Sequence, residues 1–211
     1  MTIVELQFPV LGRELPEDNG YALYAAVSRT LDDHLPDDVA VASIGGPLLG
    51  DWKVRVTPET RLRIRAPAER IGELLPLAGK FLDVDGHEIR LGVPRVQALE
   101  AAPNLCARLV TIKGFTEPEL FLGAVRRKLD ELQVSGEAAI PPIPYGSRQG
   151  APQRRIVTVK GRAIVGFALT VRGLTDAESL TLQERGLGGR RHMGCGIFSP
   201  LVEESMSRHA L

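Results

Sequence analysis

The stretch LCARLVTIKGFTEPELFLGAVRRKLDEL, residues 105–132, decides the fold, because it begins an order of elements that the chain has already used once. Its first part, residues 105–113, is apolar enough to predict a strand. Thr116 and Glu119 have the spacing of a helix capping box, and Pro118 suits the first turn. Apolar residues then recur at helical spacing, so we expect a strand followed directly by a helix.

Patterns on both sides of this stretch predict the remaining elements. Before it we expect a strand at 2–10, a helix at 20–34, strands at 39–44, 52–56 and 61–65, a helix at 67–75, a hairpin of 81–84 with 87–91, and a connection at 95–105. After it we expect a long loop at 134–153, a hairpin of 155–159 with 162–171, a helix capped by Thr175 and Glu178 that stops at Gly186, and a strand at 194–202. Each half thus has the order strand, helix, two strands, helix, strand. The sequence predicts an α+β protein with two tandem ferredoxin-like βαββαβ domains, 1–100 and 101–211.

The charges balance over the whole chain but differ between its halves. There are 26 Lys and Arg side chains and 26 Asp and Glu side chains. Residues 1–100 have a net charge of −5 and residues 101–211 a net charge of +5. We therefore expect the second half to face an anion. With 44% hydrophobic and 25% charged residues, the composition excludes a disordered tail, a coiled coil and a collagen-like fibre.

The cysteines and histidines predict no metal centre. Cys106 and Cys195 lie far apart, and the four histidines have no spacing that is typical of a ligand set. No apolar segment is long enough to span a bilayer. These features favour a reduced, cytoplasmic protein without a metal site.

The run GLGGRRHMGCG, residues 186–196, is the segment that says most about function. Its five glycines let the main chain approach a ligand, and exposed N–H groups in such loops bind phosphate oxygens. Arginine adds bidentate donors for the same anion. The alternative is a flexible connector from a helix to a strand, with solvated arginines. We favour anion binding, and the candidate RNA contacts are Arg185, Gly186, Gly188, Gly189, Arg190, Arg191, His192, Gly194 and Gly196.

This glycine spacing resembles the C-terminal signature of the CRISPR-associated repeat-cleaving endoribonucleases, a family of the RAMP superfamily. The segments GYALY at 20–24, ARLVTIKGF at 107–115 and the region 179–196 resemble its MYXAN-subtype branch. The resemblance implies tandem ferredoxin-like domains, binding of CRISPR repeat RNA, and processing of precursor transcripts into guide RNAs in antiviral defence. It also implies metal-independent cleavage without a cofactor. The 2′-hydroxyl attacks the phosphate and leaves 2′,3′-cyclic phosphate and 5′-hydroxyl ends.

The same resemblance points to the start of the first helix as the catalytic region. The branch usually has a histidine where this chain has Asn19, and an asparagine side chain can position a group but cannot act as a general base. His34 is the nearest alternative, although a histidine that interacts with the helix C-terminus is equally consistent. Tyr21 could orient the substrate or pack on the sheet. The catalytic candidates are Asn19, Tyr21 and His34.

Further cations extend the predicted RNA contacts. Lys113 follows a strand, and Lys160 lies in a hairpin turn. Lys53, Arg55, Arg61, Arg63 and Arg65 recur with a period of two and could form a basic ladder, unless neighbouring acids neutralise them. Two other functions stay open. One is a catalytically impaired RNA-binding subunit of a CRISPR effector complex, and the other is a protein scaffold without RNA activity.

Overall fold

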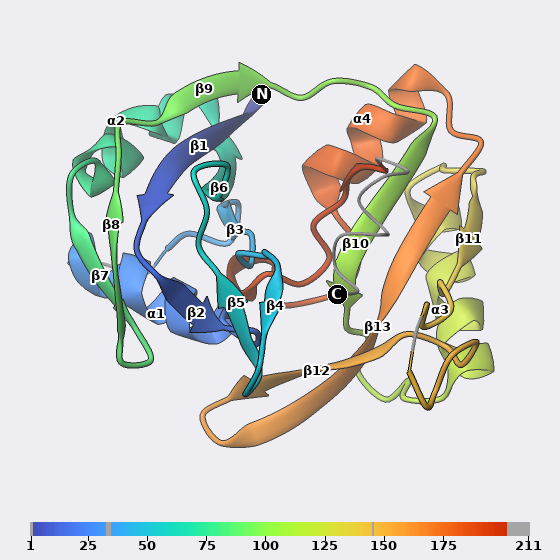
Figure 1. Ribbon diagram of the computed structural model, residues 1–211. Helices are drawn as coiled ribbons and strands as arrows, with labels where there is room; N and C mark the ends of the chain where they lie inside the picture. Colours follow the sequence, from blue (N-terminus) through green and yellow to red (C-terminus); the bar gives the residue numbers. More distant parts are fainter. Residues whose placement is uncertain (1, 33–34, 145, 202–211) are drawn as a thin grey trace. The chain divides into compact units, whose positions relative to one another are not determined.

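The computed structural model describes residues 2–32, 35–144 and 146–201, which form two compact units (Figure 1). Among the described residues, unit 1 contains those up to Ala98 together with His192–Gly194, and unit 2 contains Leu99–Arg191 and residues 195–201. The chain thus contributes three residues of its glycine-rich run to unit 1. No helix within the described ranges is long and apolar enough to cross a membrane.

Unit 1 is built on one antiparallel sheet. Its elements are β1 (Ile3–Leu11), α1 (Gly20–Thr30), β3 (Ala40–Val41), β6 (Arg61–Pro67), η1 (Ala68–Arg70), α2 (Ile71–Leu74), η2 (Leu75–Leu77), β7 (Phe81–Val84), β8 (His87–Leu91) and β9 (Arg95–Ala98). The strand order is β3-β6-β1-β8-β7, and β9 pairs with β1. A smaller sheet of β2 (Glu14–Pro16), β5 (Lys53–Arg55) and β4 (Leu48–Leu49) completes the unit.

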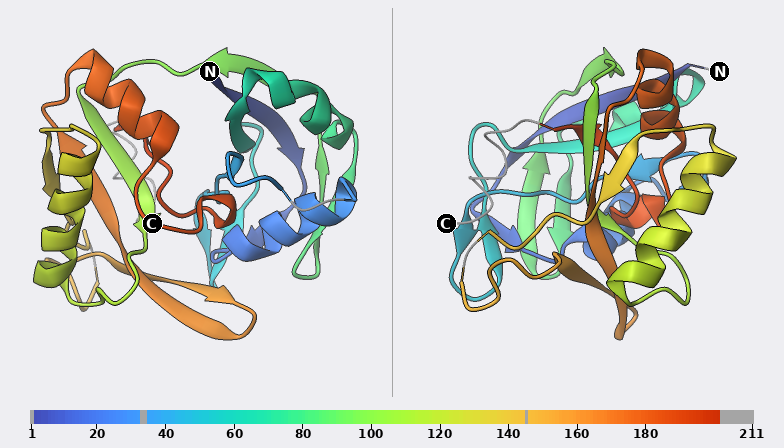
Figure 2. Two further views of the ribbon diagram at one scale, coloured as in Figure 1. Left: turned by 180° about the vertical axis from the view of Figure 1, so that it is seen from behind. Right: turned by 90° about the vertical axis from the view of Figure 1, so that its right-hand side faces the viewer.

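The core of unit 1 follows from the alternation of side chains along β1. Leu6 and Phe8 pair in register with Ile64 and Leu62 of β6, and all four are fully buried. Because side chains of a strand alternate between its faces, Glu5 lies on the opposite face. The helices α1 and α2 cover the apolar face, as the left view of Figure 2 shows.

Unit 2 repeats this plan. Its elements are β10 (Asn104–Val110), α3 (Pro118–Glu131), β11 (Glu137–Ala139), β12 (Arg154–Val159), β13 (Arg162–Arg172), α4 (Asp176–Arg185) and β14 (Ser199–Pro200), and η3 (Arg191–Met193) connects α4 to the last strand. The strand order is β11-β13-β10-β14, with β12 paired to β13. Phe121 of α3 and Phe167 of β13 meet in its core, with ring centroids 4.8 Å apart.

Both sheets confirm the predicted fold class. In unit 1, β3 and β6 lie on one side of β1, and β8 lies on the other. In unit 2, β11 and β13 lie on one side of β10, and β14 lies on the other. This is the arrangement of a ferredoxin-like sheet. Two local signals are confirmed. The hairpin turn at Asp85 and Gly86 has positive φ at both residues, and the Thr175–Glu178 capping box is formed.

Other expected elements were wrong in detail. The predicted connection at 95–105 contains β9, whose residues are all exposed and so leave no apolar alternation to read. The predicted helix at 67–75 is three short helical segments, with Pro76 in the last. Thr116 caps nothing: α3 begins after Glu117, without a side-chain cap. In the predicted strand at 194–202, only Ser199–Pro200 is a strand among the residues described.

Candidate functional site

Asn19, the residue at the position expected to be catalytic, is completely buried. Its Nδ2 donates hydrogen bonds to the carbonyl oxygens of Pro16 and Ile44, each at 2.8 Å, and its Oδ1 accepts one from the Ile44 amide at 2.9 Å. Both amide hydrogens are used and the side chain has no exposed surface, so Asn19 presents no group to a substrate in this structure. Asn19 instead ties the start of α1 to the segment after β3.

The start of α1 packs closely against residues of the glycine-rich run. A Cβ at Gly20 would collide with the Met193 carbonyl oxygen, and a Cβ at Gly194 would collide with the Ser43 hydroxyl. Gly194 is buried with φ +81°, a conformation that favours glycine. Gly194 therefore permits close packing within unit 1, which explains the glycine without an anion.

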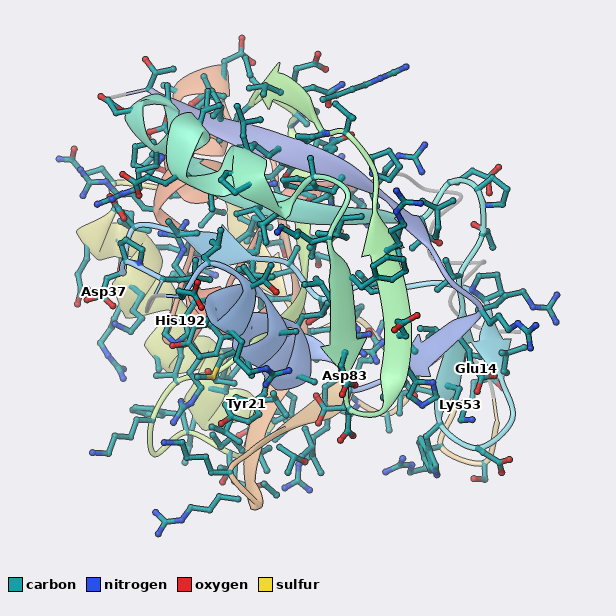
Figure 3. The ribbon with its side chains drawn as sticks, turned by 90° about the vertical axis from the view of Figure 1, so that its left-hand side faces the viewer. Glu14, Tyr21, Asp37, Lys53, Asp83 and His192 are labelled. Atoms are coloured by element: carbon teal, nitrogen blue, oxygen red, sulfur yellow. The ribbon has the colours of Figure 1, made fainter. Side chains whose placement is uncertain are left out.

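An aromatic cluster lies beside this contact. The His192 ring is 4.7 Å from the Tyr24 ring, and the Tyr24 ring is 6.4 Å from the Tyr21 ring. All three side chains are half-buried, and Figure 3 shows Tyr21 and His192 beside α1. The structure thus brings two predicted residues, Tyr21 and His192, into one cluster. Sequence analysis missed Tyr24, although its spacing of three from Tyr21 on a helix places the two on one face.

The other histidines do not join this cluster within the described ranges. His34 and His209 lie outside the described residues. His87 has its Nδ1 3.8 Å from Glu14 Oε1, and Lys53 Nζ lies 2.5 Å from the same oxygen. The hydrogen bond from Lys53 holds the pKa of Glu14 below its usual value. Figure 3 shows Glu14 and Lys53 together, well apart from Tyr21 and His192.

The expected basic ladder is not formed. Lys53 and Arg55 belong to β5 in the small sheet, whereas the other three arginines belong to β6. Arg65 is only 3% exposed, and its Nε donates to Glu5 Oε2 at 2.9 Å. Burial alone would raise the pKa of Glu5, but the charges of Arg63 and Arg65 and two hydrogen bonds lower it below its usual value. This pair is buried on the face of the β1–β6 sheet opposite the apolar core.

In unit 2, the glycine-rich run is partly bound to its own sheet. The Gly186 amide donates to Leu182, the Gly189 amide to Thr111 and the Gly196 amide to Leu109, all at main-chain carbonyls. Gly186 and Gly196 are also buried. The expectation that these amides are open to an anion is wrong at these three glycines.

Close packing accounts for further glycines of the run. A Cβ at Gly188 would collide with the Thr111 carbonyl oxygen, and a Cβ at Gly196 would collide with the Leu187 carbonyl oxygen. Both glycines have positive φ, at +84° and +67°. The spacing of this signature thus lets the run lie directly on β10 and on itself.

The middle of the run is the part that reaches solvent. Gly188, Gly189 and Arg190 are exposed, and Arg185 is exposed at the end of α4. Arg191 is half-buried, and its guanidinium donates to the Glu184 carbonyl at 2.7 Å. Of the three predicted arginines, Arg185 and Arg190 present their charge to solvent, while Arg191 also anchors the chain.

A longer basic segment of unit 2 escaped the sequence analysis. From Ala138 to Thr175 there are six basic residues and no Asp or Glu. They are Arg148, Arg154, Arg155, Lys160, Arg162 and Arg172, and all but the half-buried Arg155 are exposed. Most lie on the β12–β13 hairpin, whose other face packs Val157 against Leu109 and Cys195. A count of acids in a sliding window would have found this segment.

The two predicted lysines of unit 2 are both exposed. Lys113 lies in the turn after β10, and Lys160 lies at the tip of the β12–β13 hairpin with φ +49°. Lys160 therefore belongs to the acid-free segment. Across the described ranges, no three His, Cys, Asp or Glu side chains gather as a metal site would require.

Comparisons with known proteins agree with this architecture. A family model described as Cas6 Crispr matches residues 4–203. The chain is 39% identical over 201 residues to the CRISPR-associated endonuclease Cas6 of Myxococcus xanthus strain DK1622, which covers 95% of this chain and 82% of that protein.

Solved structures share the fold at low identity. One described as CRISPR associated protein Cas6 has a TM-score of 0.62 at 11% identity, covering 95% of this chain and 99% of the other. An RAMP protein binding different RNA substrates has a TM-score of 0.64 at 12% identity, covering 96% of this chain and 100% of the other. Because the family model spans nearly the whole chain and the Myxococcus relative is 39% identical over 95% of this chain, the chain belongs to the Cas6 family of CRISPR-associated proteins.

Proposed function

We propose that the chain binds the repeat RNA of CRISPR transcripts and cleaves it into guide RNAs, without a metal ion. The observation that carries the proposal is the acid-free segment from Ala138 to Thr175, whose exposed cations suit a polyphosphate chain. The 39% identical relative is named an endonuclease, and a structural neighbour is described as binding different RNA substrates. Both descriptions agree with an RNA substrate.

RNA contacts are assigned to unit 2. Lys113, Lys160, Arg185 and Arg190 are its predicted cations that reach solvent. Arginine binds phosphate with two parallel hydrogen bonds, and lysine binds it as a point charge. The exposed glycines 188 and 189 let the RNA strand approach the main chain beside Arg190.

The reaction is an in-line transfer within the RNA. The 2′-oxygen gives up its proton to a general base and forms a bond to the adjacent phosphorus, while the bond from phosphorus to the 5′-oxygen breaks. The leaving 5′-oxygen takes a proton from a general acid. The products are a 2′,3′-cyclic phosphate and a 5′-hydroxyl.

We assign the proton transfers to the aromatic cluster of unit 1. His192 is half-exposed, and histidine exchanges protons near neutral pH. Tyr24 packs against the His192 ring and holds its orientation, and Tyr21 supplies a hydroxyl that can bind the phosphate or the ribose. Asn19 holds the first turn of α1 and so acts only through the position of Tyr21.

The test is cleavage of repeat RNA by the full chain in EDTA. We expect a 2′,3′-cyclic phosphate on the upstream product, and no cut when the ribose before the scissile phosphate is 2′-deoxy, although that RNA still binds. Tight binding of intact RNA in every condition would instead favour a catalytically impaired subunit of an effector complex. Absence of RNA binding at low salt would leave the protein scaffold.

A His192→Gln variant tests whether His192 transfers a proton as the general base or the general acid. We expect RNA affinity to stay within about threefold and the cleavage rate to fall by about 100-fold or more. His87→Gln is the matched control, because that ring lies beside Glu14 and Lys53, away from the cluster. An unchanged rate for His192→Gln would contradict the assignment.

A further inference from the structure

The turn between β4 and β5 presents the only tryptophan of the chain to solvent. Trp52 is 82% exposed, more than any other large hydrophobic side chain within the described ranges. Elsewhere the rings of Phe81 and Phe115 lie under guanidinium groups, 5.5 Å from Arg90 and 5.6 Å from Arg127. No ring or cation covers the Trp52 ring among the residues that the structure describes. Its faces are open to a flat ligand.

The main chain fixes this exposed position. Asp51 and Trp52 have φ of +60° and +58°, a left-handed conformation that aspartate tolerates and that is costly for a bulky residue such as tryptophan. The Trp52 carbonyl accepts a hydrogen bond from the Glu17 amide at 2.7 Å, and Lys53 pairs with strands on both sides. A glycine or asparagine would adopt this turn more easily. The turn thus holds a large ring in solvent at a cost in backbone strain.

The surroundings of Trp52 favour a nucleotide over a protein surface. Arg55 and Arg13 are exposed, and neither has an acidic partner in the described part of the chain. They lie at the end of the paired strands β2 and β5 away from the Trp52 turn, where the Val56 amide donates to the Arg13 carbonyl. Among the nearby acids, Glu14 is bound by Lys53, Asp51 is exposed on the turn itself, and Glu17 and Asp18 follow the neighbouring strand β2.

An apolar docking patch is not present around the ring. On β2, β4 and β5, Leu48 is the one exposed large hydrophobic side chain, at 39%. A protein interface buries a contiguous apolar centre, whereas proteins that bind single-stranded RNA combine isolated exposed rings with nearby cations. The β4–β5 turn has the second pattern.

We propose that Trp52 is a stacking site for an unpaired base of the RNA, with Arg55 and Arg13, at the other end of the same strands, contacting phosphates further along the RNA strand. This inference rests on the proposed RNA function and adds a single-stranded subsite on unit 1. Stacking on an aromatic ring tolerates any base, because every base has a flat π face. The subsite therefore adds affinity for an unpaired flank without reading its sequence.

The single tryptophan makes the test direct. Full-length protein is titrated with a repeat hairpin that has an unpaired flank, and with the same hairpin trimmed to its paired stem. Binding is followed by anisotropy of a dye on the RNA, and stacking by tryptophan fluorescence. We expect quenching with the flanked RNA, saturating at the concentration that saturates the anisotropy, and little quenching with the bare stem.

Substitutions separate stacking from a structural role. Trp52→Ala should weaken binding of the flanked RNA by about 5- to 100-fold and leave the bare stem unaffected. Trp52→Tyr should restore most of the loss. Phe81→Ala is the matched control, because it removes another exposed ring of unit 1 and should not change the affinity.

The outcomes distinguish this inference from the proposed function. RNA binding with unchanged tryptophan fluorescence and an unaffected Trp52→Ala variant would overturn the stacking site and leave the RNA function standing. The stacking site would also be overturned if Trp52→Ala lost equal affinity for the flanked RNA and for the bare stem, or if Trp52→Tyr failed to recover affinity. Absence of RNA binding at low salt would remove both proposals.

Discussion

Unit 1 and unit 2 have the same strand order but use their polar residues differently. In unit 1 the decisive polar groups are inside: Asn19 is fully buried, and Glu5 pairs with the almost fully buried Arg65. In unit 2 a run of 38 residues carries six cations without an acid, and five of these six cations are exposed. Buried polar groups hold a fold together when each has a partner, whereas unbalanced exposed charge serves an external anion.

Breaking the buried ion pair should give the largest loss of stability. Glu5→Ala leaves the Arg65 charge buried without its carboxylate, and we expect a loss of about 3–5 kcal/mol in the free energy of unfolding, measured in urea. The double variant Glu5→Leu with Arg65→Met removes both charges and should lose less than Glu5→Ala alone. A loss below about 1 kcal/mol for Glu5→Ala would show that the pair is not important for stability.

Asn19 offers the next largest effect. Asn19→Ala leaves two carbonyl groups and one amide without their partner, which should cost about 2–4 kcal/mol. Asn19→His cannot reproduce three hydrogen bonds in the same space, so we expect it to destabilise the protein without faster cleavage. Gln97→Ala, which truncates an exposed amide on β9, is the control and should change stability by less than about 0.5 kcal/mol. Faster cleavage by a stable Asn19→His variant would contradict the structural role.

In unit 2 the corresponding change should alter binding and leave stability almost unchanged. Replacing Arg154, Lys160 and Arg162 with Gln removes three exposed charges from the acid-free hairpin. We expect weaker RNA binding and a plot of log affinity against log salt that is shallower by about 2. The control is Arg126→Gln on α3, which removes one exposed positive charge from a segment that also contains acids. An unchanged slope for the triple variant would remove the hairpin from the RNA interface.

The contrast between units also explains which features the sequence could predict. The hairpin turns, the Thr175–Glu178 capping box and the ferredoxin-like order of the elements depend mainly on neighbours in sequence, and these predictions were confirmed, whereas the equally local Thr116–Glu119 box did not form. Two of the three hydrogen bonds of Asn19 reach across 25 residues, and Glu5 and Arg65 lie 60 residues apart. Alternating arginines on β6 look the same in sequence whether they face solvent or a buried carboxylate. Only the pairing of β1 with β6 separates the two cases.

The smallest expected effect concerns Glu178, which caps α4 of unit 2. Main-chain hydrogen bonds from Ser135 and Thr175, with a further one from the Thr175 hydroxyl, lower the pKa of Glu178 to about 2. Because the folded-state pKa lies below the unfolded value of about 4.3, the carboxylate stabilises the fold above that pH. The stabilisation is lost as the pH falls from about 4 to about 2.

The Glu178→Gln variant should therefore melt at a lower temperature than the parent protein at pH 7, and the two melting temperatures should converge near pH 2. Glu119→Gln on α3, where no side chain caps the helix, should show no such convergence, and a gap for Glu178→Gln that stays constant with pH would contradict the assigned role of the charge.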